Sequence, residues 1–210
     1  MYLPAHFEQR DPALLQGLMR EHPLATLVTL QGGEPAADAV PLHFDAATQT
    51  LRGHVARANP LWQAADGQRV LVVFHGPQAY VTPNWYPSKA STHKVVPTWN
   101  YTVVQARGVL RAVPDAPWLH GLVSELTQTH EAAQPRPWAV SDAPDDYVQA
   151  MLRAIVGIEI AVDSLVGKWK VSQNRSEADR LGVADGLQAE GSTAEAQAMA
   201  ALVRDPPRGG

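Results

Sequence analysis

One group of side chains suited to holding an anion lies in H-V-A-R-A-N-P, residues 54–60, where a predicted strand meets a predicted helix. Asn59 is a typical N-cap residue, and Pro60 is favoured in the first helical turn. The start of a helix offers free N–H groups and the positive end of a dipole, and Arg57 could add a charge-assisted bond to a phosphate. The same pattern also fits an ordinary helix cap beside an exposed arginine, with His54 in the preceding strand.

A second group lies in the aromatic-rich passage 70–101. Its hydrogen-bonding side chains are Thr82, Asn84 and Ser88, and its aromatic ones are Tyr80, Trp85 and Tyr86. In V-P-T-W-N-Y, residues 96–101, the alternation of a strand places Thr98 and Asn100 on one face and Trp99 on the other. The passage fits either the wall of a ligand site or a contact between subunits, and Trp99 alone also fits a core position.

The third group is G-K-W-K-V-S-Q-N-R, residues 167–175, which follows the last predicted strand. Its cations are Lys168, Lys170 and Arg175, and its uncharged polar residues are Ser172, Gln173 and Asn174. This segment fits an anion site and a solvated basic loop equally well.

Composition excludes several other kinds of chemistry. The 210 residues contain no cysteine, which rules out disulfides, thiolate catalysis and cysteine-based zinc sites, and the eight histidines show no H-E-x-x-H spacing. Neither a G-x-G-x-x-G motif nor a Walker loop is present. A net charge of −4 and the lack of a basic recognition helix give no support to DNA binding. No apolar run approaches the roughly 18 residues that span a bilayer, and no signal pattern opens the chain, so we expect a cytoplasmic protein.

The elements that would position these groups are mostly short strands. The expected strands are 24–30, 35–44, 51–56, 70–74, 79–82, 98–113 and 156–165. The expected helices are 11–22, a short one after Asn59, 114–130, one from Asp142 or Pro144 to Leu152, and 176–187. Gly32-Gly33 and Gly76-Pro77 are expected to form turns. Closely spaced strands with turn signals between them indicate a barrel or sandwich.

Several blocks resemble one known family when they are taken in order. They are M-Y-L-P-A-H-F-E, H-P-L-A-T-L-V-T, L-R-G-H-V-A-R-A-N-P, F-H-G-P-Q-A-Y-V-T-P-N-W-Y, V-P-T-W-N-Y, P-W-A-V-S-D-A-P and G-K-W-K-V-S-Q-N-R. Together they resemble the PaiB family of FMN-binding negative transcriptional regulators. The resemblance runs from Met1 to about Leu187 and leaves the Ala-rich tail outside.

The resemblance implies a fold, a cofactor and a set of contacts. The fold would be mainly β with flanking helices (α+β): a homodimeric, FMN-binding split β-barrel of the pyridoxamine-phosphate-oxidase type. One domain would span residues 1–187, with helical additions at about 114–152 and 176–187, followed by a partly disordered tail at 188–210. His54, Arg57 and Asn59 would hold the FMN phosphate, and Thr82, Trp99 and Asn100 would lie along the ribityl chain or ring. Lys168, Gln173 and Asn174 would reach the cofactor from the partner subunit.

The resemblance also implies a role as a negative transcriptional regulator, a flavin-dependent redox protein, or both. Two alternatives stay open. One is an FMN-dependent oxidoreductase that does not bind DNA. The other is a haem-binding split barrel in which His54, His75 or His93 is the ligand.

Overall fold

The computed structural model describes residues 1–191 and 193–207, which form two compact units. Unit 1 consists of Met1–His22, His75–Val104 and Val166–Gly210, and unit 2 consists of Pro23–Phe74 and Gln105–Leu165. The strands β6 (Arg69–Val81), β7 (Thr98–Val113) and β8 (Ile155–Lys170) contribute residues to both. None of the described helices is long and apolar enough to span a bilayer.

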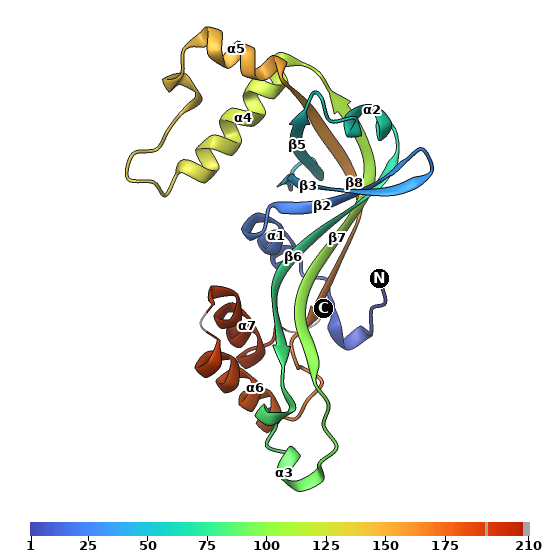
Figure 1. Cartoon of the computed structure of the whole chain (residues 1–210), viewed down its shortest axis with the longest axis vertical. Coiled ribbons are helices and arrows are strands. Elements are labelled where there is room, and N and C mark those ends of the chain that lie inside the picture. The colour runs from blue at the N-terminus through green and yellow to red at the C-terminus, as the bar shows by residue number, and fades with distance from the viewer. Residues whose placement is uncertain (192, 208–210) are drawn as a thin grey trace. The chain divides into compact units, whose positions relative to one another are not determined.

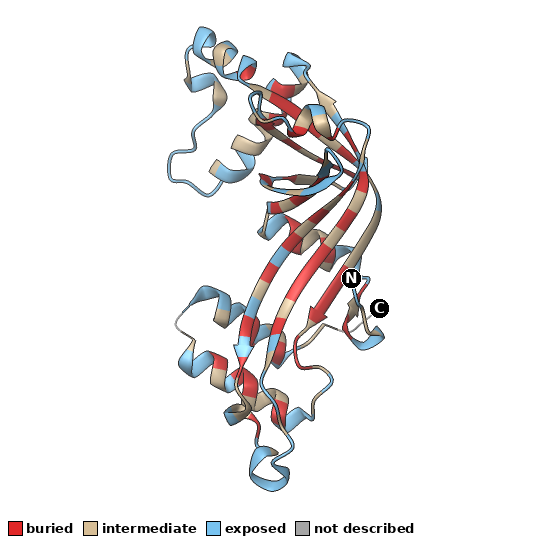
Figure 2. Cartoon of the chain, turned by 45° about the vertical axis from the view of Figure 1, so that its right-hand side comes forward, coloured by how far each residue is buried: buried red, intermediate tan, exposed pale blue. Residues whose placement is uncertain are grey.

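Unit 2 is built on an antiparallel sheet with the strand order β3-β2-β6-β7-β8-β5-β4 (Figure 1). The strands β2 (Leu24–Gln31) and β3 (Glu34–Pro41) form a hairpin, whose turn residues Gly32 and Gly33 have φ of 61° and 89°. β5 (Thr50–Ala56) pairs with β8 on one side and with β4 (His43–Asp45) on the other. Buried and partly exposed residues alternate along β2 and β5, as a sheet with one face on a core requires (Figure 2).

The helices of unit 2 are α2 (Leu61–Ala64), α4 (Ala116–Glu131), the short helix η3 (Val140–Asp142) and α5 (Asp145–Arg153). The Asp115 carboxylate caps α4 by accepting a hydrogen bond from the Trp118 N–H at 2.8 Å. Leu119 and Leu122 on α4 are buried, while the Trp118 ring lies against Gly157 of β8. A Cβ at Gly157 would come within 2.3 Å of that ring, so glycine is what allows the close contact.

Unit 1 begins with η1 (Ala5–Phe7), β1 (Glu8–Gln9) and α1 (Pro12–Glu21), and β1 pairs antiparallel with the end of β8. Asp11 caps α1 as its sequence predicts, accepting a hydrogen bond from the Ala13 N–H at 2.8 Å. The remaining helices are η2 (Pro83–Trp85), α3 (Lys89–Thr92), α6 (Glu177–Glu190) and α7 (Ala194–Arg204). α6 and α7 lie side by side (Figure 1), and Arg180 of α6 donates to the Val203 carbonyl of α7 at 2.7 Å.

A group of polar residues, which we call the polar clasp, joins α6 to the segment before α3. The clasp consists of Ser88, Arg175, Ser176 and Asp179. The Asp179 carboxylate accepts hydrogen bonds from the Ser88 N–H at 3.0 Å and from the Ser88 hydroxyl at 2.8 Å. Burial raises the pKa of Asp179, but these bonds, the Ser176 hydroxyl and the Arg175 charge together hold it below its ordinary value. Next to the clasp, Gly186 of α6 lies directly against the Trp85 ring.

Two sequence predictions about the elements are wrong. Gly76-Pro77 forms no turn, because β6 continues through it to Val81. The alternation of buried residues instead shifts by one position between Gly76 and Ala79, and a Cβ at Gly76 would come within 2.3 Å of the Thr102 hydroxyl. The glycine therefore serves close packing. Lys168 and Lys170 lie within β8 and not in a loop after it.

The Ala-rich tail is expected to be helical in part. Residues 194–204 form the regular helix α7, whose Met199, Ala200 and Val203 are buried. This part of the tail is ordered because its small apolar residues share one face that packs on α6. The expected fraying of the chain end falls on residues 208–210, which lie outside the described residues. The grouping of residues 1–187 as one domain stays a prediction.

Candidate functional site

His54 lies on β5, on the same face as Arg52, and its side chain is half-buried. Its Nδ1 atom is buried and has no hydrogen-bond partner among the described residues. Burial lowers the pKa of His54, so the imidazole is neutral at neutral pH. A neutral imidazole with an unused nitrogen can donate or accept one further hydrogen bond.

Arg57 follows the end of β5 and is partly engaged by the backbone. Its Nε donates to the Arg153 carbonyl at 2.7 Å, and its Nη2 donates to the Ile155 carbonyl at 2.9 Å. A guanidinium carries five N–H groups, so three remain after these two bonds. The two carbonyls hold the side chain in one orientation, which leaves an exposed, preoriented cation at the end of the strand.

Asn59 is engaged at both ends of its side-chain amide. Its Oδ1 accepts from the Leu61 N–H at 2.9 Å, and its Nδ2 donates to Asp38 at 3.2 Å. The expected cap is shifted by one residue, because α2 begins at Leu61 with Pro60 as its N-cap, and Asn59 forms a turn just before it. With only four residues, α2 offers a weak helix dipole. Of the three predicted phosphate contacts in unit 2, Arg57 keeps three free N–H groups and His54 an unpartnered nitrogen among the described residues, while Asn59 keeps one N–H.

Three further predicted residues belong to unit 1. Thr82 caps η2, where its hydroxyl accepts from the Asn84 N–H at 3.3 Å. Asn100 is buried and donates to the Ser172 hydroxyl at 2.9 Å. Trp99 is 55% exposed and meets the Tyr80 ring edge-on, with the ring centroids 5.9 Å apart. Trp99 is therefore a surface aromatic and does not occupy the core position that its sequence also allowed.

The cations at the end of β8 are partly buried. Lys168 donates to the Tyr2 carbonyl at 3.2 Å, and its ammonium lies 5.1 Å from the centre of the Tyr101 ring. Lys170 donates to the Thr98 hydroxyl at 2.7 Å and to the Trp99 carbonyl. Burial lowers the pKa of Lys170, and the nearby positive charges of Lys168 and Arg175 lower it further.

Gln173 and Asn174 differ in how far they are engaged. The Gln173 amide bridges its own loop, accepting from the Val171 N–H at 2.8 Å and donating to the Trp169 carbonyl at 2.5 Å. Asn174 is exposed. Unit 1 thus brings Asn100 to the loop that holds Gln173, through Ser172. Sequence reasoning missed the pairing of Asn100 with Ser172, because no local pattern links residues 72 positions apart.

Comparison with solved structures defines the class of fold. The flavocytochrome Anf3 from Azotobacter vinelandii superposes with a TM-score of 0.58 at 13% identity, over 78% of this chain and 69% of that one. The FAD and heme binding protein from Mycobacterium smegmatis gives 0.57 at 17% identity, over 78% and 73%. The chain therefore has their α+β architecture, a large antiparallel sheet with flanking helices.

Sequence comparison then defines the family. Residues 1–164 match the family described as "Putative FMN-binding domain", and the chain belongs to this PaiB-like family. "Uncharacterized protein AN0679" from Emericella nidulans is 36% identical, over 98% of this chain and 97% of the relative. "Protease synthase and sporulation protein PAI 2" from Bacillus subtilis is 31% identical, with the same coverage. The family resemblance seen in the sequence is confirmed.

Proposed function

We propose that this chain binds FMN and that the group at the end of β5 holds the FMN phosphate. The observation that carries the proposal is the family match over residues 1–164, which includes this whole group. The chemistry of the side chains fits a phosphate: Arg57 has three N–H groups left, and His54 has a buried nitrogen with no partner among the described residues. Asn59 supports the group by fixing the backbone between β5 and α2.

The residues of unit 1 are proposed separately as contacts to the rest of the flavin. Thr82, Trp99 and Asn100 offer a hydroxyl, an exposed aromatic ring and a buried amide for the ribityl chain or ring. Lys168, Gln173 and Asn174 are proposed to act from the partner subunit of a homodimer. FMN, when bound, supplies the redox chemistry, while these residues bind and orient it.

The proposed role is that of a cytoplasmic negative transcriptional regulator, a flavin-dependent redox protein, or both. The family resemblance supports the first role, and the printed name of the Bacillus subtilis relative links that relative to protease synthesis and sporulation. The net charge of −4 favours the second role, because it gives no general attraction to DNA. Fluorescence anisotropy with promoter DNA distinguishes the two, since phosphate-mediated binding must weaken steeply as salt rises.

The absorption spectrum of the purified protein with added FMN tests the proposal directly. We expect a bound-flavin spectrum and a change in flavin fluorescence, and their absence would refute FMN binding. A Soret band on addition of haem would instead support the haem alternative.

Arg57→Ala tests the phosphate contact. Loss of a charge-assisted bond should weaken FMN by about 1.5–3 kcal/mol, roughly a 10- to 150-fold rise in Kd. Arg153→Ala is the control, because it removes a neighbouring exposed arginine but keeps the carbonyl that Arg57 binds. Thermal unfolding without FMN shows whether Arg57→Ala also loosens the fold. An unchanged Kd would refute the role of Arg57.

A further inference from the structure

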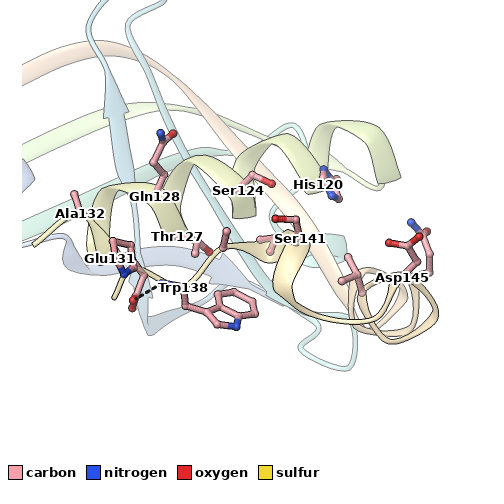
Figure 3. A pocket seen from close by; sticks show the side chains of 14 residues that line it. His120, Ser124, Thr127, Gln128, Glu131, Ala132, Trp138, Ser141 and Asp145 are labelled. Carbon is pink, nitrogen blue, oxygen red and sulfur yellow. Dashed lines mark hydrogen bonds between the residues drawn. The ribbon is translucent and has the colours of Figure 1, made fainter. Parts of the chain in front are cut away.

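A pocket of about 640 Å³ lies in unit 2 between α4, the segment 137–141 and the start of α5 (Figure 3). Its volume is within the range of small-molecule sites. None of its lining residues belongs to the groups proposed to bind FMN. The pocket is therefore a separate feature, and its chemistry can be considered independently of the flavin.

One face of α4 forms the polar side of the pocket, which we call the pocket floor. Five residues contribute to it at helical spacing: His120, Ser124, Thr127, Gln128 and Glu131. The buried Leu119 and Leu122 lie on the other face of the same helix. Within the described part of the chain, the side chains of Ser124, Thr127 and Gln128 have no hydrogen-bond partner. A ligand with polar groups could replace the water that hydrates them at little cost.

The opposite wall is aromatic and apolar. Trp138 has an exposed fraction of 48%, and its backbone N–H donates to the Glu131 carboxylate at 3.0 Å. This bond ties the loop to α4, and Figure 3 shows the Trp138 indole ring extending from the bonded backbone on the side away from the Glu131 carboxylate. Val140 and Val148 add apolar lining. A ligand here meets an aromatic ring, an apolar wall and a polar floor.

The negative charge of the pocket lining determines which ligand charge the pocket favours. Glu131 and Asp145 are both carboxylates, and the described lining contains neither lysine nor arginine. They lie apart in Figure 3, with Glu131 next to Trp138 and Asp145 towards the His120 end. Glu131 has one oxygen engaged by Trp138 and keeps acceptor capacity on the other. Two carboxylates without a balancing cation repel anions and attract cations.

We propose that this pocket binds a small organic cation, an ammonium group attached to an apolar body. The ammonium group binds the free carboxylate oxygen of Glu131 and lies near the Trp138 ring, which adds a cation–π attraction. The apolar body lies along Val140 and Val148, and the floor hydroxyls accept or donate any remaining hydrogen bonds. Asp145 adds a second negative charge, so a ligand with two ammonium groups should bind more tightly than a ligand with one.

Isothermal titration calorimetry of the full chain with three matched probes tests the charge selection. The probes are 2-phenylethylamine, a cation, 2-phenylethanol, which is neutral, and phenylacetate, an anion. We expect the amine to bind at least tenfold more tightly than the alcohol, and the anion not to bind. Equal binding of amine and alcohol, or no binding of the amine up to about 10 mM, would overturn the proposal.

Matched variants test the site. Glu131→Gln keeps the acceptor for the Trp138 N–H but removes the charge, and we expect it to weaken the amine about tenfold or more. Asp145→Asn should weaken it less, while its control Asp146→Asn, on the next residue of the same helical turn, should leave it unchanged.

Trp138→Leu should weaken the amine about threefold or more by removing the cation–π attraction. Its control is Tyr147→Leu, which removes an exposed aromatic residue outside the pocket lining. Amine binding that survives both Glu131→Gln and Trp138→Leu would place the site elsewhere and refute the assignment. The titrations are run with and without FMN, so a failure of FMN binding does not affect their outcome.

Discussion

The polar clasp in unit 1 and the α4–α5 pocket in unit 2 use similar side chains in opposite ways. In the clasp, the buried Asp179 accepts hydrogen bonds from both the backbone and the hydroxyl of Ser88. In the pocket, Ser124 and Thr127 line a hollow and bond to no described side chain or backbone group. The clasp joins α6 to a segment 91 positions earlier in the chain, whereas the pocket lies between α4 and the segment that follows it.

The difference separates polar residues that hold the fold from those available to a ligand. A buried carboxylate must be fully hydrogen-bonded, because leaving it unpaired costs several kcal/mol. Polar groups beside water carry no such requirement. The clasp therefore stabilises the fold, and the pocket floor contributes little to stability, which leaves it free to recognise a ligand.

The largest effect is expected from Asp179→Ala. It leaves the Ser88 N–H and hydroxyl without their acceptor in a buried place, so the free energy of unfolding should fall by about 2–4 kcal/mol. Urea unfolding measures the change. Asp185→Ala on the same helix is the control, because Asp185 forms only an exposed ion pair with Arg204 and should cost less than about 1 kcal/mol. Equal losses would contradict a special role for the clasp.

The packing beside the clasp should be the next most sensitive feature. A Cβ at Gly186 would lie 2.4 Å from the Trp85 ring, so Gly186→Ala should destabilise the protein by about 1–3 kcal/mol. Gly121→Ala on α4 is the opposite case, because no atom lies within 4 Å of the new Cβ. That variant should stabilise α4 by about 0.5–1 kcal/mol through helix propensity. Thermal unfolding of both variants measures the contrast.

His54 is an intermediate case, since its side chain is half-buried and its Nδ1 atom has no hydrogen-bond partner among the described residues. Burial lowers its pKa in the folded chain below the ordinary value near 6.5. As the pH falls through about 6.5, His54 therefore takes up a proton in the unfolded chain before it does so in the folded chain. The stability that the neutral His54 contributes to the folded chain is thus present above that pH and is lost below it.

Thermal unfolding of the wild type and of His54→Gln between pH 7.5 and 5.5 measures this contribution. The wild type should lose more stability on acidification than the variant. His130→Gln at the exposed end of α4 should follow the wild-type profile. Parallel profiles for wild type and His54→Gln would show that His54 does not contribute.

The smallest effect is expected in the pocket floor. Ser124→Ala should change the free energy of unfolding by less than about 0.5 kcal/mol, because the hydroxyl has no bond to lose within the described structure. Ser88→Ala in the clasp makes the matched comparison and should cost about 1–2 kcal/mol. A large loss for Ser124→Ala would show that the floor is structural and would remove the contrast.

Local signals were sufficient for many of the elements. Asp11-Pro12 starts α1, Gly32-Gly33 turns the β2–β3 hairpin, and β7 has the predicted bounds Thr98–Val113. These features depend on residues close in sequence. Gly76-Pro77 shows where such signals fail, because its glycine is required by Thr102 and Leu18, which are distant in sequence.

The candidate site was predictable in part, because some of its features also depend on residues close in sequence. The type and order of residues 54–60 indicated Arg57 as a cation at the end of a strand, and that is where it lies. Its bonds to the carbonyls of Arg153 and Ile155 depend on the pairing of β5 with β8, which the local sequence does not reveal. The pocket beside α4 escaped prediction because Trp138 and α4 meet only in the folded chain.

The sequence by itself determined the family, most of the strands and helices, and the residue types available for an anion. Those properties follow from local propensity and from motifs that are continuous in the chain. Only the tertiary structure decided which polar groups are satisfied: Asp179 by Ser88 and Asn100 by Ser172, while Ser124 and Thr127 on α4 are bonded by no described residue. Hydrogen-bond satisfaction depends on distances between residues far apart in sequence, and those distances exist only once the chain has folded.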